Sequence, residues 1–225
     1  MSVALQTWAI VVAGGSGARF GRRKQLVTVA GRRVIDWSLD VLRPHVDGVV
    51  AVMPNDLVTG ATAIEVDADV VVAGGDSRSA SVRAGLEALP GAVQRVLVHD
   101  AARPLTNGAL VERVLAALAQ ADAVVPVVPV TDTLRLVSGG TADRSQFVAV
   151  QTPQGFAVHT LRQAHRHNSD ATDDAALVDQ LGGKVVHVDG DPGNLKITVP
   201  HDLVLAEALF KQRAAEFEPE GTDQT

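Results

Sequence analysis

The sequence predicts an α/β fold of the Rossmann-like type, a three-layer sandwich in which helices cover both faces of a mostly parallel sheet. Short apolar runs rich in valine alternate with segments of helical periodicity, which is the pattern of βαβ layering. The runs are apolar almost throughout, as expected for parallel strands that are covered on both faces. Polar clusters follow several of these runs, so a site is expected where the strands end.

Expected strands and helices alternate regularly as far as Pro129. The third helix shows the evidence most clearly, because Leu110, Val111, Val114 and Leu118 recur at helical spacing and form an apolar stripe. The strands are expected at 8–13, 46–53, 69–73, 95–99 and 122–130. The helices between them are expected at 33–43, 77–89 and 107–120.

The alternation breaks after Pro129. Residues 131–150 contain polar residues and glycines around two short β-prone stretches, 133–137 and 146–151. This pattern predicts a β-hairpin arm that projects from the sheet. The remaining elements are expected to be helices at 157–168, 173–182 and 201–215, and strands at 184–189 and near 195–199.

Length and composition favour a single folded unit. The chain has 225 residues, of which 46% are hydrophobic and 20% charged, enough for one substantial core. Neither a linker nor an internal repeat interrupts it. We therefore expect one domain over 1–217, with 131–150 as its arm, and a disordered tail over 218–225.

Composition also limits the classes of function. The chain has no cysteine, which excludes disulfides, thiolate metal sites and cysteine nucleophiles. A formal net charge of −6 argues against a nucleic-acid partner. The apolar runs are too short for a membrane helix, and no signal peptide is recognisable. We expect a cytoplasmic protein that binds neither nucleic acid nor membrane.

The first expected strand leads directly into a glycine-rich loop that ends at Lys24. Four glycines between Gly14 and Gly21 let backbone N–H groups turn toward a bound anion without interference from Cβ atoms. Arg19 and Lys24 add positive charge to the same loop. A strand followed by such a loop predicts a binding site for nucleotide phosphates.

Three further polar clusters follow expected strands, at 74–81, 99–104 and 129–133. Because the carboxyl ends of parallel strands lie at one edge of a sheet, we expect these loops to converge with the glycine loop on one site.

In their order along the chain, these motifs resemble those of the 2-C-methyl-D-erythritol 4-phosphate cytidylyltransferase family of the non-mevalonate isoprenoid pathway. The resemblance covers nearly the whole chain, although the arm and the glycine loop are shorter than is usual in that family. The matching motifs are Lys24-Gln25, Gly74-Gly75-Asp76 with Arg78, His99-Asp100-Ala101-Ala102-Arg103-Pro104, Asp132-Thr133, Asp143-Arg144, Gln151-Thr152-Pro153-Gln154-Gly155-Phe156, Thr172-Asp173-Asp174-Ala175 and Lys196-Ile197-Thr198.

The resemblance implies transfer of CMP from CTP to a phosphate monoester, with release of pyrophosphate. The attacking phosphate oxygen is already anionic at neutral pH, so the reaction needs no general base. The difficulty is the charge that accumulates on the phosphates. A site rich in arginine, lysine and backbone donors, without an obvious catalytic histidine, suits this chemistry.

The resemblance also implies a role for each candidate site residue. Arg19 and Lys24 would be catalytic, and would stabilise phosphate charge in the transition state. Arg144 and Lys196 would hold the acceptor phosphate. Further acceptor contacts would come from Thr133, Asp100, Arg103 and Thr172. The nucleotide would be bound by Ala13, Gly14, Gly15, Gly17, Gly75, Asp76 and Ser81.

A metal and a partner subunit are also implied. By resemblance, a Mg²⁺ or other divalent cation that bridges the phosphates would lie near Asp100. The arm exposes two strand edges and carries apolar residues that a monomer cannot easily bury, which predicts pairing with a second copy of the chain. By resemblance, the partner's arm would deliver the residues at positions 133 and 144 to the site. The apolar arm residues are Leu134, Leu136, Val137, Phe147, Val148 and Val150.

Three alternative functions remain open. A ribitol-5-phosphate cytidylyltransferase, or another sugar-phosphate nucleotidyltransferase, would use the same chemistry. An oxidoreductase is suggested by the glycine spacing from Gly15 to Gly21 and by Asp36 further on. However, Asp36 falls inside a helical pattern, and the chain has no tyrosine for the proton relay of short-chain reductases. A non-catalytic nucleotide-binding module would be expected to lack the charged residues, but the chain contains Arg19, Lys24, Arg144 and Lys196.

Structural roles are alternatives for several charged residues. Arg144 has Asp143 as a possible ion-pair partner, Lys196 fits a strand edge, and Asp100 fits a turn cap. Asp173 and Asp174 are best explained as a helix N-cap and an acidic first turn.

Overall fold

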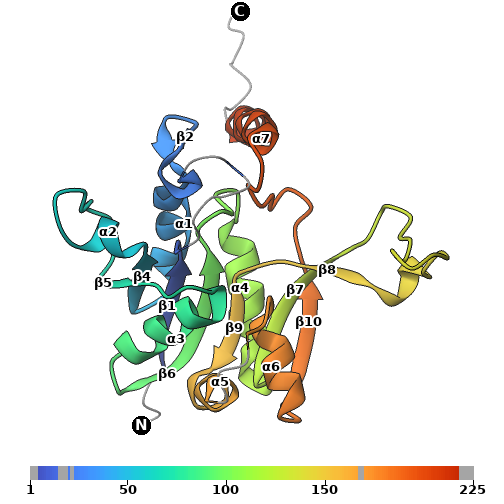
Figure 1. The fold of residues 1–225 in the computed structure, drawn as a ribbon, viewed down its shortest axis with the longest axis horizontal. Coiled ribbons are helices and arrows are strands. Elements are labelled where there is room, and N and C mark those ends of the chain that lie inside the picture. The colour runs from blue at the N-terminus through green and yellow to red at the C-terminus, as the bar shows by residue number, and fades with distance from the viewer. Residues whose placement is uncertain (1–4, 15–19, 21–22, 167–169, 218–225) are drawn as a thin grey trace, which may run out of the picture.

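The computed structural model describes residues 5–14, 20, 23–166 and 170–217. The tail expected over 218–225 lies outside these residues. An α/β fold is confirmed, with one large sheet and helices on both of its faces (Figure 1). The helices are α1 (Val34–Leu42), α2 (Asn55–Val58), α3 (Arg78–Ala88), α4 (Gly108–Ala117), α5 (Val158–His165), α6 (Asp174–Gln180) and α7 (His201–Phe217).

The large sheet has the strand order β10-β7-β9-β6-β1-β4-β5, with β8 paired to β7. It is mostly parallel, because β9 alone in this order runs against its neighbours β6 and β7. Its strands are β1 (Gln6–Val12), β4 (Gly48–Met53), β5 (Val70–Ala73), β6 (Val93–Asp100), β7 (Ala123–Pro129), β8 (Val148–Val150), β9 (Gln154–Ala157) and β10 (Val185–Asp189).

Two hydrophobic clusters fill the space between the sheet and its helices. Alternate residues of β1 point to opposite faces, so Ile10 packs with α3, α5 and α6, whereas Ala9 and Val11 pack with α1 and α4. Both faces of the central strands are therefore covered, which explains why these strands are apolar throughout. A third, smaller cluster packs α7 against the start of α1 and buries Ile197 completely.

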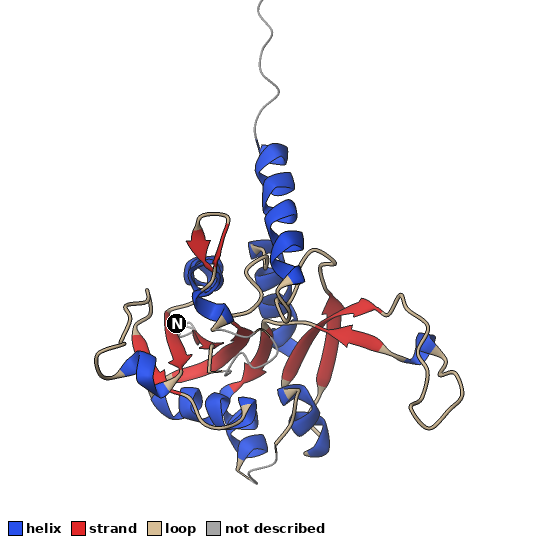
Figure 2. Ribbon diagram, turned by 45° about the horizontal axis from the view of Figure 1, so that its top comes forward, coloured by secondary structure: helices blue, strands red, loops and turns tan. Residues whose placement is uncertain are grey.

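The arm differs from the predicted hairpin. The stretch 133–137 is not a strand; its one ladder contact is an isolated bridge between Arg135 and Thr141. The second stretch is present as β8, but it pairs with the end of β7. The chain between them turns back at Gly139 and Gly140, where φ is +105° and +87°. The arm thus has a β7–β8 stem and a looped tip, and it projects from the sheet (Figures 1 and 2).

Three other local expectations need correction. The strand predicted near 195–199 is absent. Ile197 makes a single backbone hydrogen bond, to Ala102, and the N–H groups of Thr198 and Val199 donate to the Asp202 carboxylate at the start of α7. The sequence pattern also missed β9 and a small antiparallel hairpin between the first loop and α1. That hairpin consists of β2 (Thr28–Val29) and β3 (Arg32–Arg33). No helix in the described part of the chain is long and apolar enough to cross a membrane.

Candidate active site

A cavity of about 560 Å³ lies at the carboxyl ends of β1 and β6 and beside the loop that follows β5. It brings together residues from three of the four predicted loops and from the segment before α7, so the expected convergence is confirmed for these three. The fourth predicted cluster, 129–133, contributes no residue to the lining. The cavity is lined by Val12, Ala13, Gly14, Lys24, Gln25, Gly75, Asp76, Ser77, Arg78, Ser81, Asp100, Ala101, Ala102 and Lys196.

Close backbone approach shapes one wall of the cavity. A Cβ atom on Gly14 would lie 2.9 Å from Ser81 Oγ, and one on Gly75 would lie 2.5 Å from the Ala80 side chain. A larger residue at position 14 would push the first loop away from α3, and one at position 75 would push the loop after β5 away from it. Ser77 caps α3 by accepting a hydrogen bond from the Ala80 N–H at 3.1 Å. The cavity therefore has a wall of backbone and small side chains, which suits a flat base and its ribose.

Two lysines reach the cavity from opposite ends of the chain. Lys24 lies in a 3-10 turn at Lys24–Leu26, and its Nζ donates to the Ile197 carbonyl oxygen at 3.0 Å. Because Ile197 is fully buried, it anchors the segment that carries Lys196. Lys196 Nζ in turn donates to Asp100 Oδ2 at 2.5 Å.

Asp100 belongs to a chain of ion pairs that leads out of the cavity. Arg78 Nε donates to Asp100 Oδ1 at 3.3 Å, and its Nη1 donates to Asp174 Oδ2 at 2.5 Å. Asp174 is fully buried at the start of α6 and also pairs with His165 Nε2 at 3.0 Å. Arg78 thus connects the site carboxylate to a buried carboxylate between α5 and α6.

The charges in this chain hold Asp100 in its ionised form. Burial raises the pKa of Asp100, but the positive charges of Arg78 and Lys196 outweigh burial and hold that pKa well below its usual range. Burial likewise lowers the pKa of Arg78, but Asp174 and Asp100 outweigh it and raise that pKa above its usual value. Lysine and arginine side chains and an ionised carboxylate therefore surround the cavity.

His99 precedes Asp100 but does not line the cavity. Burial lowers its pKa to about 4, so the ring is neutral at pH 7. Its Nδ1 lies 3.1 Å from Thr152 Oγ1, which also accepts the backbone N–H of Asp100 at 3.1 Å. His99 therefore supports the backbone that presents Asp100.

Two predicted substrate-binding residues, Arg103 and Thr172, lie outside the lining of the cavity. Arg103 is buried and donates to the carbonyl oxygens of Asn194 and Val150, so it ties the segment before Lys196 to the base of the arm. Thr172 is exposed, and neither residue lines the cavity. The predicted N-cap role of Asp173 is confirmed, since its Oδ1 accepts the Ala175 N–H at 3.3 Å.

Thr133 and Arg144 belong to the projecting arm, and neither lines the cavity of its own chain. Both are exposed, and the Arg144 guanidinium donates to the Thr131 carbonyl oxygen. Asp143 accepts hydrogen bonds from Ser145 and Gln146, so it does not form the ion pair considered for Arg144. Within one chain, no residue of the arm lines the cavity that the two lysines reach.

Three predicted site residues, Arg19, Gly15 and Gly17, lie outside the described residues. Among the lining residues without a predicted role are Arg78 and Gln25; Gln25 is buried, and its Nε2 has no hydrogen-bond partner among the described residues. A buried amide donor beside a cavity is typical of a group that awaits a ligand. Both residues lie inside motifs that carry the family resemblance, and that position was their only sequence signal.

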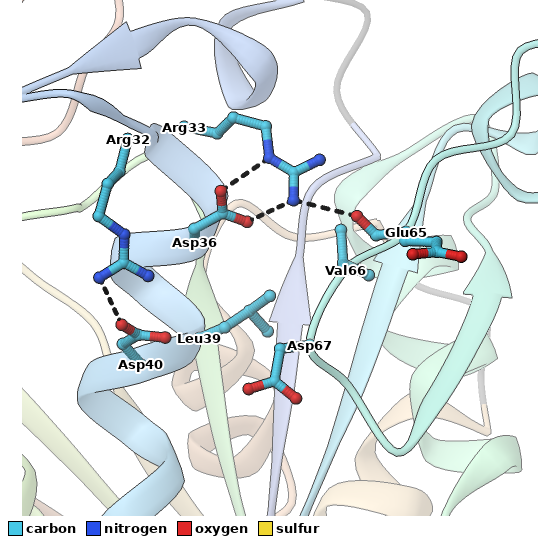
Figure 3. A pocket seen from close by; sticks show the side chains of 8 residues that line it. All are labelled: Arg32, Arg33, Asp36, Leu39, Asp40, Glu65, Val66 and Asp67. Carbon is cyan, nitrogen blue, oxygen red and sulfur yellow. Dashed lines mark hydrogen bonds and ion pairs between the residues drawn. The ribbon is translucent and has the colours of Figure 1, made fainter.

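A second depression, of about 400 Å³, lies between α1 and the segment before β5 (Figure 3). Both of its arginines are paired with carboxylates of α1. Arg33 binds the Asp36 carboxylate through Nε and Nη2, both at 2.7 Å, and Arg32 pairs with Asp40 at 2.6 Å. Asp36 lies within α1 and not at the end of a strand. It is therefore not placed to bind a dinucleotide ribose, which removes the main support for an oxidoreductase.

Comparison with known proteins gives one consistent family. The family model described as "IspD: 2-C-methyl-D-erythritol 4-phosphate cytidylyltransferase" matches residues 7–212. A relative from Nocardia farcinica with that enzyme name is 45% identical over 92% of this chain and 95% of its own length. Another, from Prochlorococcus marinus, is 40% identical over 91% of this chain and 98% of its own length.

Solved structures agree with the sequence matches. The crystal structure of the enzyme of this name from Thermus thermophilus superposes with a TM-score of 0.77 at 39% identity, and covers 93% of this chain and all of its own. A 4-diphosphocytidyl-2C-methyl-D-erythritol synthase from Anaerococcus prevotii has a TM-score of 0.79 at 26% identity, over 92% of this chain and 99% of its own.

Proposed function

Because the chain belongs to the 2-C-methyl-D-erythritol 4-phosphate cytidylyltransferase family, we propose that it transfers CMP from CTP to 2-C-methyl-D-erythritol 4-phosphate and releases pyrophosphate. The observation that carries this proposal is the cavity itself. Lys24, Lys196 and Arg78 surround it, and no histidine of the described residues lines it. Such a site suits a reaction in which an anionic phosphate attacks another phosphate and charge stabilisation is the main task.

The nucleotide would occupy the wall formed by the two glycine-containing loops. Close approach at Gly14 and Gly75 leaves room for a base beside Ala13, Asp76 and Ser81. Lys24, together with Arg19 as expected from the sequence, would meet the charge that develops on the phosphates. Lys196, which also lines the cavity, would hold the acceptor phosphate.

A Mg²⁺ ion fits this site if the triphosphate supplies most of its ligands. Asp76 and Asp100 are the carboxylates that line the cavity, and no group of three or more metal-binding side chains occurs among the described residues. Magnesium in nucleotide sites is commonly held by one or two carboxylates, substrate phosphates and water. We propose that Asp100 contributes to such a site, where the metal would offset phosphate charge.

We propose that the enzyme is a homodimer in which the arm of each subunit completes the site of the other. The tip and stem of the arm expose Leu136, Phe147 and Val148, with 57%, 49% and 44% of their surface accessible, and Val137 is fully exposed. Exposed apolar residues concentrated on one projecting element are typical of an interface. Delivery by a partner would also give Thr133 and Arg144 a role at the acceptor.

The function is tested by incubating the purified protein with CTP and Mg²⁺ and a panel of polyol phosphates, and by measuring pyrophosphate release. We expect turnover with 2-C-methyl-D-erythritol 4-phosphate. Turnover with ribitol 5-phosphate alone would refute the acceptor but keep the chemistry. No release with any acceptor would refute both.

A further inference from the structure

A separate depression of about 440 Å³ lies between α3 and α5, and it shares no lining residue with the nucleotide cavity. Its lining carries three guanidinium groups, one imidazole and one carboxylate. The chain as a whole has a net charge of −6, so this concentration of arginines on one spot is unusual for the molecule. The lining residues are Arg83, Leu86, Glu87, Arg162, His165 and Arg166.

Two buried polar atoms in this lining have no hydrogen-bond partner in the described structure, Arg83 Nη1 and His165 Nδ1. His165 is only 3% exposed, and its other ring nitrogen is used by Asp174. Buried polar atoms in folded proteins are nearly always satisfied by protein, water or ligand. The unpartnered Arg83 donor beside this depression indicates a ligand with acceptor oxygens, and His165 Nδ1, whose ring donates from Nε2 to Asp174, can accept from a hydroxyl of the same ligand.

The arginines divide into one that is fixed and two that are available. Arg162 donates from Nη2 to the Leu86 carbonyl oxygen at 3.0 Å, which holds its guanidinium between the two helices. Arg83 and Arg166 form no ion pair with any described residue. Guanidinium groups bind the oxygens of phosphoryl groups with paired, charge-assisted hydrogen bonds.

We propose that this depression is a second anion site, which binds the phosphoryl group of a small molecule or free phosphate. The available guanidinium groups of Arg83 and Arg166 neutralise the anion, and Arg83 Nη1 gains the acceptor that it lacks. A bound anion would also lie against His165, the outer end of the ion chain that runs through Asp174 and Arg78 to Asp100.

The test uses a Lys24→Ala/Lys196→Ala variant, in which phosphate binding at the nucleotide cavity is weakened. Backbone amide resonances are followed by NMR during titration with inorganic phosphate and, separately, with glycerol 3-phosphate. We expect saturable shifts in the segments that carry Arg83 and Arg162. Tighter binding of glycerol 3-phosphate would identify a phosphate monoester as the ligand, and equal binding would identify free phosphate.

Adding Arg83→Gln should weaken this binding at least tenfold, whereas Arg95→Gln, the same change outside the depression, should leave it unaltered. Arg166→Gln, at an exposed position, should weaken binding at least threefold and serves if the Arg83 variant does not fold. Shifts that fail to saturate, or that respond equally to Arg83→Gln and Arg95→Gln, would overturn the proposal.

Discussion

The Asp100 carboxylate lies between two positive side chains, and each of them connects it to another part of the molecule. Lys196 comes from the segment anchored by Ile197, and Arg78 extends from the start of α3 to the buried Asp174. The carboxylate therefore fixes the positions of two groups that come from distant parts of the chain. Its lowered pKa follows from these neighbours and keeps it charged throughout the physiological range.

Lys196→Ala should raise the KM for the acceptor more than the KM for CTP. The lysine offers a charge-assisted hydrogen bond to a phosphate, and loss of such a bond costs about 1.5–3 kcal/mol, or roughly ten- to a hundredfold in affinity. Steady-state kinetics with each substrate varied in turn measures the difference. Lys184→Ala, at a lysine outside the cavity, is the matched control. Equal changes in both KM values would argue against an acceptor-phosphate role.

Because His99 is buried, we expect the free energy of unfolding to fall in mild acid. Burial lowers its pKa from 6.5 to about 4, so the unfolded state binds the proton more readily than the folded state. Above pH 6.5 the ring is neutral in both states, and the free energy of unfolding carries no penalty from His99. As the pH falls from about 6.5 toward 4, protonation of the unfolded state lowers the free energy of unfolding, by at most about 3 kcal/mol.

Urea denaturation of the wild type and of His99→Gln between pH 4 and pH 7.5 measures this effect. The free energy of unfolding of the variant should depend less on pH in that window. Parallel curves for the two proteins would show that His99 does not titrate as its burial requires.

Helix α6 is held to the rest of the molecule by the buried carboxylate of Asp174, which pairs with Arg78. Asp174→Asn keeps the shape of the side chain but leaves Arg78 without its closest partner, and breaking a buried ion pair costs about 3–5 kcal/mol. We expect a loss of this size in urea denaturation, accompanied by a lower kcat because Arg78 no longer has a fixed position beside Asp100. Asp179→Asn, an exposed change on the same helix, should alter neither quantity; equal behaviour of the two variants would contradict the role given to Asp174.

The parallel part of the sheet could be predicted from the sequence because its strands are buried on both faces. Runs such as Val49 to Met53 are apolar at every position, and a short run of this kind is typical of a parallel strand between two helical layers. In contrast, β9 was missed because Gln154 and Gly155 break the apolar pattern, although the strand fills the gap between β6 and β7. The pairing of β8 with β7 could not be predicted either, since a short β-prone stretch does not specify which strand it pairs with.

Part of the site could also be predicted, because its loops have local sequence signals. The loops after β1, β5 and β6 are recognisable by their glycines and charges, and the topology brings them together. The partnership of Arg78 with Asp174 joins residues 96 positions apart, and nothing in the local sequence indicates it. The contacts of Arg103 likewise depend on where the carbonyl oxygens of Asn194 and Val150 come to lie.

For the whole molecule, the arm predicts a site shared between two subunits. In a heterodimer of an Arg144→Ala subunit and a Lys24→Ala subunit, one of the two sites would contain both native residues. We expect such a heterodimer to recover activity that neither homodimer has, measured as pyrophosphate release after purification with two different affinity tags. A verified heterodimer without activity, or a fully active monomer, would show that Arg144 does not act across an interface.

The central claim is that cations around the cavity stabilise charge that develops during phosphoryl transfer, and Lys24 tests it most directly. The single-turnover rate of Lys24→Ala should fall by about 10²–10³, since the lost interaction is stronger in the transition state than in the ground state. CTP binding, measured by titration calorimetry, should weaken far less. A rate within a few-fold of the wild type would contradict this claim and would leave Lys24 as a structural residue, which donates to the Ile197 carbonyl oxygen.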